Sequence, residues 1–160
     1  MSSFRHRLLG LPVLVALCAA AGCSSGDDSA TAAVPSPDAA VAKLCRNLDG
    51  ALPKTVDGLG REDPRPASAL TAGWGSPAII LRCGVARPAE MNDPEADGAE
   101  VDGVGWLLQK RDDGSFRFTT TLRLAYVEVT IPKSRTGHGV APLAVLAPAI
   151  KKAIPEGIAD

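Results

Sequence analysis

The stretch VGWLLQKRDDGSFRFTTTLRLAYVEVTI, residues 104–131, decides the fold. Its first five residues alternate between two faces, and the period of two is typical of a half-buried strand. The sequence Asp112-Asp113-Gly114 follows, and Asp-Gly tolerates the positive φ of a hairpin turn. After the turn the apolar residues stand first at even positions, from Phe116, and then at odd positions, from Val127. We predict an antiparallel hairpin and a bulge or tight bend near residues 123–126, because a one-residue shift reverses the faces of a strand.

One helix is predicted on each side of this region. Ser36-Pro37-Asp38 is a typical helix start, with a capping serine, a proline at the first helical position and an early acid. Apolar residues then recur at helical spacing from Val41 to Leu48. A second set at the same kind of spacing runs from Leu143 to Ile154, and lysines suit the end of that helix.

The segments between the first helix and the hairpin contain one clear strand. Residues 53–77 are rich in proline and glycine and are expected to form an irregular loop. Residues 78–83 are a short apolar run and predict a buried strand, and residues 86–100 predict a polar, acidic surface loop. The predicted fold class is α+β, a small antiparallel sheet of about four strands with an N-terminal and a C-terminal helix packed on one face. This domain spans residues 37–155, and residues 156–160 form a tail.

The N-terminal residues have the pattern of an export signal. A short basic start is followed by an uncharged apolar run at residues 8–21, too short to span about 30 Å of hydrocarbon as a helix. Small residues then precede Cys23, as in a bacterial lipobox. We predict a lipoprotein signal peptide at residues 1–22 and fatty acyl chains such as palmitate on Cys23. The small polar residues at 23–36 predict a flexible tether.

Other readings of this leader stay open. Ala19-Ala20-Ala21 is also a site for the ordinary signal peptidase, which would release a soluble secreted protein. An uncleaved anchor is a third reading, although it would need a longer apolar run. The predicted location is the extracytoplasmic face of the cell membrane, lipid-anchored, with secretion as the alternative.

Two cysteines remain in the predicted domain. Cys45 lies on the apolar stripe of the first helix, and Cys83 ends the predicted strand. An even number of cysteines in an exported chain favours a disulfide. Two separate buried thiols are the alternative. The long spacing does not suit a redox pair, which usually has C-x-x-C spacing.

The charged and metal-binding residue types exclude several functions. The net charge of −1 argues against nucleic-acid binding, which normally needs a basic surplus. His138 is the only histidine after the leader, and we find neither a G-x-S-x-G sequence nor a zinc ligand set. The acidic residues at 90–102 resemble a calcium loop only loosely and predict a solvated face. We therefore assign no catalytic residue, no metal and no cofactor, and an enzyme using His138 is a minor alternative.

One pair of residues is a candidate ligand pocket. Trp74 is flanked by glycines next to the predicted strand, and Arg82 is a charged residue inside that strand. A tryptophan in such a place can line a pocket or close the edge of the core. Arg82 can bind a ligand or form a surface ion pair.

Several short motifs together resemble a known family. They are Cys45, Ala51-Leu52-Pro53, Trp74-Gly75-Ser76-Pro77, Ile79-Ile80-Leu81-Arg82-Cys83-Gly84 and Val127-Glu128-Val129-Thr130-Ile131-Pro132. This pattern is similar to the domain of unknown function 3515 family, which comprises exported proteins and lipoproteins of high-GC Gram-positive bacteria. The resemblance covers most of residues 38–155 and supports export and the pairing of the two cysteines. It implies no activity and no catalytic residue.

The expected function is that of a non-enzymatic cell-envelope lipoprotein. Cys23 would hold it on the membrane, and its domain would bind an envelope protein or a cell-wall partner. The alternative is an exported protein that binds a small ligand near Trp74 and Arg82.

Overall fold

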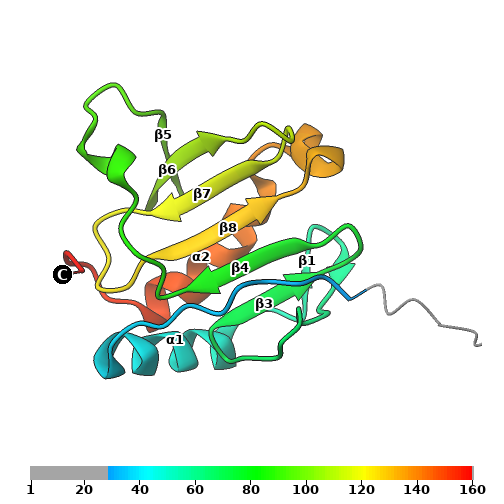
Figure 1. The fold of residues 1–160 in the computed structure, drawn as a ribbon, viewed down its shortest axis with the longest axis horizontal. Coiled ribbons are helices and arrows are strands. Elements are labelled where there is room, and N and C mark those ends of the chain that lie inside the picture. The colour runs from blue at the N-terminus through cyan, green and yellow to red at the C-terminus, as the bar shows by residue number, and fades with distance from the viewer. Residues whose placement is uncertain (1–28, 160) are drawn as a thin grey trace, which may run out of the picture.

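The computed structural model describes residues 29–159, which form one α+β body with a six-stranded antiparallel sheet and a small two-stranded sheet (Figure 1). In chain order the elements are α1 (Ala39–Ala51), β1 (Thr55–Val56), β2 (Leu59–Gly60), β3 (Thr71–Trp74), β4 (Ile79–Cys83), η1 (Ala89–Asn92), β5 (Gly98–Val101), β6 (Val104–Lys110), β7 (Phe116–Thr120), β8 (Val127–Ile131), η2 (Lys133–His138) and α2 (Ala141–Ala153). The predicted fold class is confirmed.

The large sheet has the order β3-β4-β8-β7-β6-β5, with two strands more than predicted. The two additional strands are the edge strands β3 and β5, and both lie in segments that the sequence analysis assigned to loops. The Pro/Gly-rich segment 53–77 also contains the β1–β2 hairpin. Strands of four residues offer too few positions for a clear alternation, and all four residues of β3 are buried.

The decisive stretch forms two consecutive hairpins. β6 pairs with β7 through the turn at residues 111–115, and β7 pairs with β8. Residues 121–126 join β7 to β8, so the predicted tight bend is a reversal of the chain. Leu122 in this loop has a φ of 53°, which is the left-handed region that L-residues seldom adopt.

Both helices cover the same face of the sheet, as predicted (Figure 1). That face carries one strand parity, including Leu81, Trp106, Phe118 and Val129, and these side chains pack with the buried residues of α1 and α2. The opposite parity forms the outer face, which carries polar residues such as Arg82 and Glu128. The sequence pattern therefore assigns the two faces correctly.

The start of α1 differs from the prediction by two residues. The N-cap is Asp38, whose side chain accepts hydrogen bonds from the N–H groups of Ala40 and Val41 at 2.7 and 3.0 Å. Ser36 and Pro37 therefore precede the helix. Aspartate is as good a cap as serine, and the sequence alone did not rank them.

Residues 29–37 lie against the outer face near β3 and β4 (Figure 1). The Ala32 N–H donates to the Arg65 carbonyl at 3.0 Å, and the Arg82 Nε–H donates to the Ala33 carbonyl at 2.8 Å. Part of the segment that the sequence analysis assigned to the tether is thus fastened to the domain. The predicted signal peptide and Cys23 lie outside the described residues.

Candidate functional site

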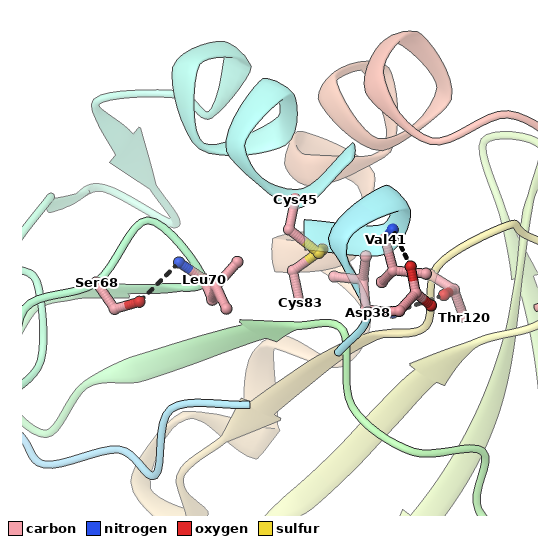
Figure 2. The surroundings of a disulfide bond; sticks show 8 residues. Asp38, Val41, Cys45, Ser68, Leu70, Cys83 and Thr120 are labelled. Atoms are coloured by element: carbon pink, nitrogen blue, oxygen red, sulfur yellow. Dashed lines mark hydrogen bonds between the residues drawn. A yellow bond between two sulfur atoms is a disulfide. The ribbon is translucent and has the colours of Figure 1, made fainter. Parts of the chain in front are cut away.

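The predicted disulfide is present and fastens α1 to the sheet (Figure 2). Cys45 lies on the buried side of α1, and Cys83 is the last residue of β4. Their Cα atoms are 5.5 Å apart, and both residues are fully buried in the core. The bond is therefore a structural link within the core.

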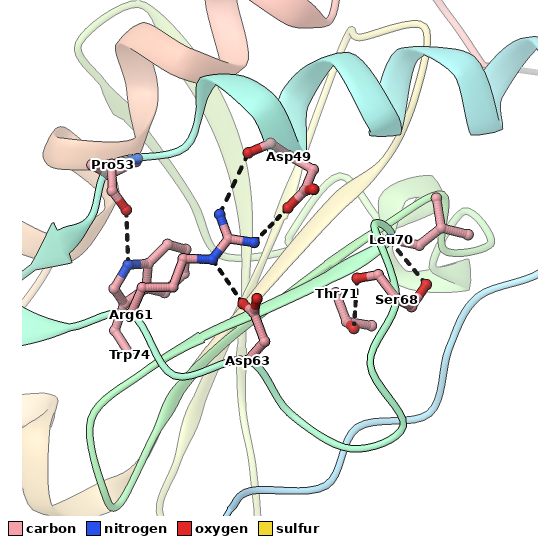
Figure 3. A network of polar contacts seen from close by, with 8 residues as sticks. All are labelled: Asp49, Pro53, Arg61, Asp63, Ser68, Leu70, Thr71 and Trp74. Atoms are coloured by element: carbon pink, nitrogen blue, oxygen red, sulfur yellow. Dashed lines mark hydrogen bonds and ion pairs between the residues drawn. The ribbon is translucent and has the colours of Figure 1, made fainter.

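Trp74 is part of the core and of a polar cluster at the end of α1 (Figure 3). It is fully buried, and its indole Nε1–H donates to the Pro53 carbonyl at 3.0 Å. The Arg61 guanidinium lies 6.0 Å from the ring centre and pairs with Asp49 and Asp63. Partial burial opposes the charge, but the hydrogen bonds to Asp63 and Asp49 outweigh it and raise the pKa of Arg61. Trp74 thus closes the core edge.

Arg82 lies on the other side of the sheet from Trp74. In the β3–β4 register Trp74 is opposite Ile79, so these two side chains share a face of the sheet. Arg82 is three residues after Ile79, and because faces alternate along a strand, its side chain lies on the other face. The candidate pocket lined by both residues is therefore not formed, and this prediction is corrected. Sequence proximity to one strand did not reveal that the residues face opposite ways.

Arg82 belongs to a row of charges on the outer face. Its Nη1 donates to Glu128 Oε1 at 3.0 Å, and the Arg117 Nε lies 3.4 Å from Glu128 Oε2. Only 8% of the Glu128 side chain is exposed, so two guanidinium groups balance one buried carboxylate. This row joins β4, β8 and β7, and through Arg82 it also holds residues 29–37.

A pocket of about 430 Å³ lies at one end of the outer face. The connection 86–97 forms one wall through Met91, and Leu122 and Ile158 form the other. Leu107 and Gly105 of β6 contribute to its lining between these walls. The lining is mainly apolar, as in most ligand and side-chain pockets.

The floor of this pocket depends on a glycine. A Cβ at Gly105 would lie 2.4 Å from the Thr121 hydroxyl, a distance that side chains do not adopt. Gly105 therefore leaves the space that the Thr121 hydroxyl occupies. Gly98 is different, because a Cβ there would meet no atom closer than 3.4 Å.

Two further hollows adjoin this pocket. One, of about 460 Å³, lies beside residues 35–38 and is lined by Arg82 and Arg87. The other, of about 330 Å³, shares Leu122 and Ile158 with the first pocket. Arg87 is held within its own connection, since its guanidinium donates to Asn92 Oδ1 at 2.6 Å and to the Met91 carbonyl at 3.2 Å.

His138 pairs with an acid from the β1–β2 hairpin. Its Nδ1 lies 2.5 Å from Asp57 Oδ2, and the histidine side chain is exposed. Among residues 29–159, no three His, Cys, Asp or Glu side chains are grouped closely enough to hold a metal ion.

The pocket residues were not predicted from the sequence. Leu122 and Ile158 are each 70% exposed, unusually so for large apolar side chains. Their signal in the sequence is weak, because each stands singly in a segment without periodicity. Only the chain reversal at residues 121–126 and the path of the C-terminal segment bring them to one pocket.

Together, fold and site define a small α+β domain, described over residues 29–159, with a disulfide between helix and sheet and hollows at one end of the sheet. The chain belongs to the family described as Protein of unknown function (DUF3515), whose model matches residues 8–159. No curated protein and no solved structure matches the chain. Within the described residues, neither helix is long and apolar enough to cross a membrane.

Proposed function

We propose that this protein is a cell-envelope lipoprotein whose α+β domain binds a partner outside the cytoplasmic membrane without catalysis. The observation that carries the proposal is the apolar pocket between residues 86–97 and the loop that contains Leu122. Leu122 is exposed and has a left-handed backbone conformation, which lowers the stability of the fold. Strained residues of this kind concentrate at binding and active sites. The partner is an envelope protein or a cell-wall component.

A lipid anchor on Cys23 would lie close to the domain along the chain. Lipid on Cys23 would be separated from the first described residue, Ser29, by six peptide steps, which span at most about 20 Å. Residues 30–33 are already hydrogen-bonded to the domain. The domain would therefore remain near the membrane surface.

The positions of the two ends of the described chain also support the proposal. The first described segment (blue) enters at one end of the sheet, and the C-terminal segment lies at the opposite end (Figure 1). Ile158 of that segment lines the pocket. A lipid anchor at the N-terminal end would thus leave the pocket on the side that points away from the membrane.

Photo-crosslinking in cells tests the proposal. A photoreactive residue replaces Leu122 in one strain and Val145, exposed on α2, in a matched control. We expect a reproducible crosslinked product from position 122 and none from position 145, together with loss of membrane attachment in Cys23→Ala. Equal labelling from both positions, or turnover of a wall substrate by the purified chain, would contradict a binding module.

A small-ligand function is the second candidate, favoured by the hollow that Arg82 and Arg87 line. Two guanidinium groups near one hollow suit an anionic molecule. Thermal unfolding with and without carboxylate and phosphate compounds tests it. A rise in the unfolding temperature that is abolished in Arg87→Ala would support it, and an unchanged temperature with all of them would exclude these ligand classes.

A further inference from the structure

The two edge strands of the large sheet, β3 and β5, differ in their backbone hydrogen bonds to the rest of the described chain. Next to the β3 edge, the Glu62 N–H donates to the Gly73 carbonyl at 2.8 Å, and the Gly75 N–H donates to the Gly60 carbonyl at 3.1 Å. At the β5 edge, among residues 29–159, no strand or bridge lies beyond Gly98–Val101. β5 is therefore an open edge (Figure 1).

The hydrogen-bond pattern shows which backbone groups of β5 face outward. The Leu108 N–H donates to the Asp97 carbonyl at 2.8 Å, which places this pair among those bonded between β5 and β6. Antiparallel ladders alternate, so the N–H and C=O groups of Gly98 and Glu100 point away from β6. On the other side of β6, Gly105, which is opposite Glu100, accepts from the Thr121 N–H, as this alternation requires.

The pocket lies beside this edge. Gly98 has the parity of Leu107 and lines the pocket with it. Because Gly98 has no side chain, a side chain from a strand added beyond β5 could reach the apolar lining across it. The edge offers backbone hydrogen bonds, and the pocket offers a place for one apolar side chain.

The charge around the edge selects the partner. Between Arg87 and Lys110 the chain has no lysine or arginine. Its acids in this range are all exposed: Glu90, Asp93, Glu95, Asp97, Glu100 and Asp102. The cations near these six acids are fewer: Arg87, whose hydrogen-bond partners are neutral, Lys110, which lies 3.4 Å from Asp97, and Lys151 of α2 beside Gly103. An incoming strand would therefore gain from basic side chains.

We propose that the β5 edge and the adjoining pocket bind an extended, basic polypeptide segment, which adds to the sheet as a further antiparallel or parallel strand and inserts one apolar side chain beside Gly98. The proposal rests on the proposed function and names the class of its partner. Main-chain hydrogen bonds at Gly98 and Glu100 provide affinity, and the pocket and the acids provide specificity.

A synthetic peptide with alternating valine and lysine about a central leucine serves as the probe, with the lipidated chain purified in detergent. In Glu100→Pro the outward N–H is lost while the ladder to β6 remains, because that N–H faces away from β6. Glu100→Gln is the matched control, which removes the charge and keeps the N–H. We expect the proline variant to bind about tenfold more weakly than the glutamine variant. Hydrogen exchange at residues 98–101 should slow on peptide binding.

Gly98→Leu tests the pocket without altering the edge. A Cβ at this position would meet no atom closer than 3.4 Å, and the rest of the leucine side chain would occupy the pocket. We therefore expect this variant to bind the probe about tenfold more weakly. No binding of the probe to the wild-type chain, or equal affinity of the proline and glutamine variants, would overturn strand addition. In that case a crosslinked partner from position 122 would still support a binding module, so the two proposals fail separately.

Discussion

Cys45 of α1 and Cys83 of β4 are joined across the core, over a sequence separation of 38 residues. A link of this length restricts the unfolded chain, which is the main source of disulfide stabilisation in the chain-entropy model. We expect Cys45→Ser combined with Cys83→Ser to lower the free energy of unfolding by about 4 kcal/mol. Urea unfolding measures it, and thiol labelling of the wild-type domain should detect neither cysteine. Equal stability of the two proteins would show that the link contributes nothing.

Gly105 and Thr121 predict a rescue experiment. In Gly105→Ala the new methyl group would meet the Thr121 hydroxyl at 2.4 Å, so we expect a loss of about 1–3 kcal/mol. Thr121→Ala removes that hydroxyl and leaves the Thr121 Cβ at 3.8 Å, so the double variant should recover most of the loss. Gly98→Ala is the control and should be close to neutral. Additive losses in the double variant would contradict the contact.

Arg82 links the N-terminal segment to the sheet. Its Nε–H donates to the Ala33 carbonyl while its Nη1 donates to Glu128. Arg82→Lys keeps the charge but cannot make both bonds in this geometry. We expect amide exchange in residues 32–37 to become about three- to tenfold faster. Arg117→Lys, on the other side of Glu128, is the matched control and should leave this segment unchanged.

Asp113 gives the β6–β7 turn a dependence on pH. The Ser115 hydroxyl and then the Ser115 backbone N–H donate to its carboxylate, and they lower its pKa. A carboxyl with a lower pKa in the folded state stabilises the fold above its unfolded pKa, and this contribution disappears as the pH falls through the folded value. Asp113→Asn should therefore show a smaller loss of stability on acidification, measured by urea unfolding at several pH values. Asp112→Asn is the control, and an unchanged profile for Asp113→Asn would exclude this contribution.

The sequence predicted the features that depend on local periodicity. The alternation in 104–131 gave the β6–β7 hairpin and the inward faces of its strands, and the spacing of Val41 to Leu48 gave the first helix. The pairing of Cys45 with Cys83 followed from cysteine number and export, and the structure bears it out. Export itself and lipid on Cys23 stay predictions.

The features that the sequence did not predict depend on tertiary contacts. β3 and β5 are edge strands whose neighbours along the chain are rich in turn residues, so their pattern resembles that of a loop. Trp74 and Arg82 are close to one strand pair but have opposite parity, which only the register reveals. The pocket joins residues 86–97, 121–122 and 158, and no local pattern relates these segments.

Leu122 predicts a conflict between stability and binding. Its φ of 53° disfavours leucine, whereas asparagine tolerates this region. Because the side chain is 70% exposed, little packing is lost, and we expect Leu122→Asn to raise the free energy of unfolding by about 0.5–1 kcal/mol. Because Leu122 lines the pocket, the same variant should bind the partner that is crosslinked at position 122 more weakly. Ile158→Asn, equally exposed, should weaken binding without the gain in stability. A stabilised Leu122→Asn protein with undiminished partner binding would separate this residue from the site.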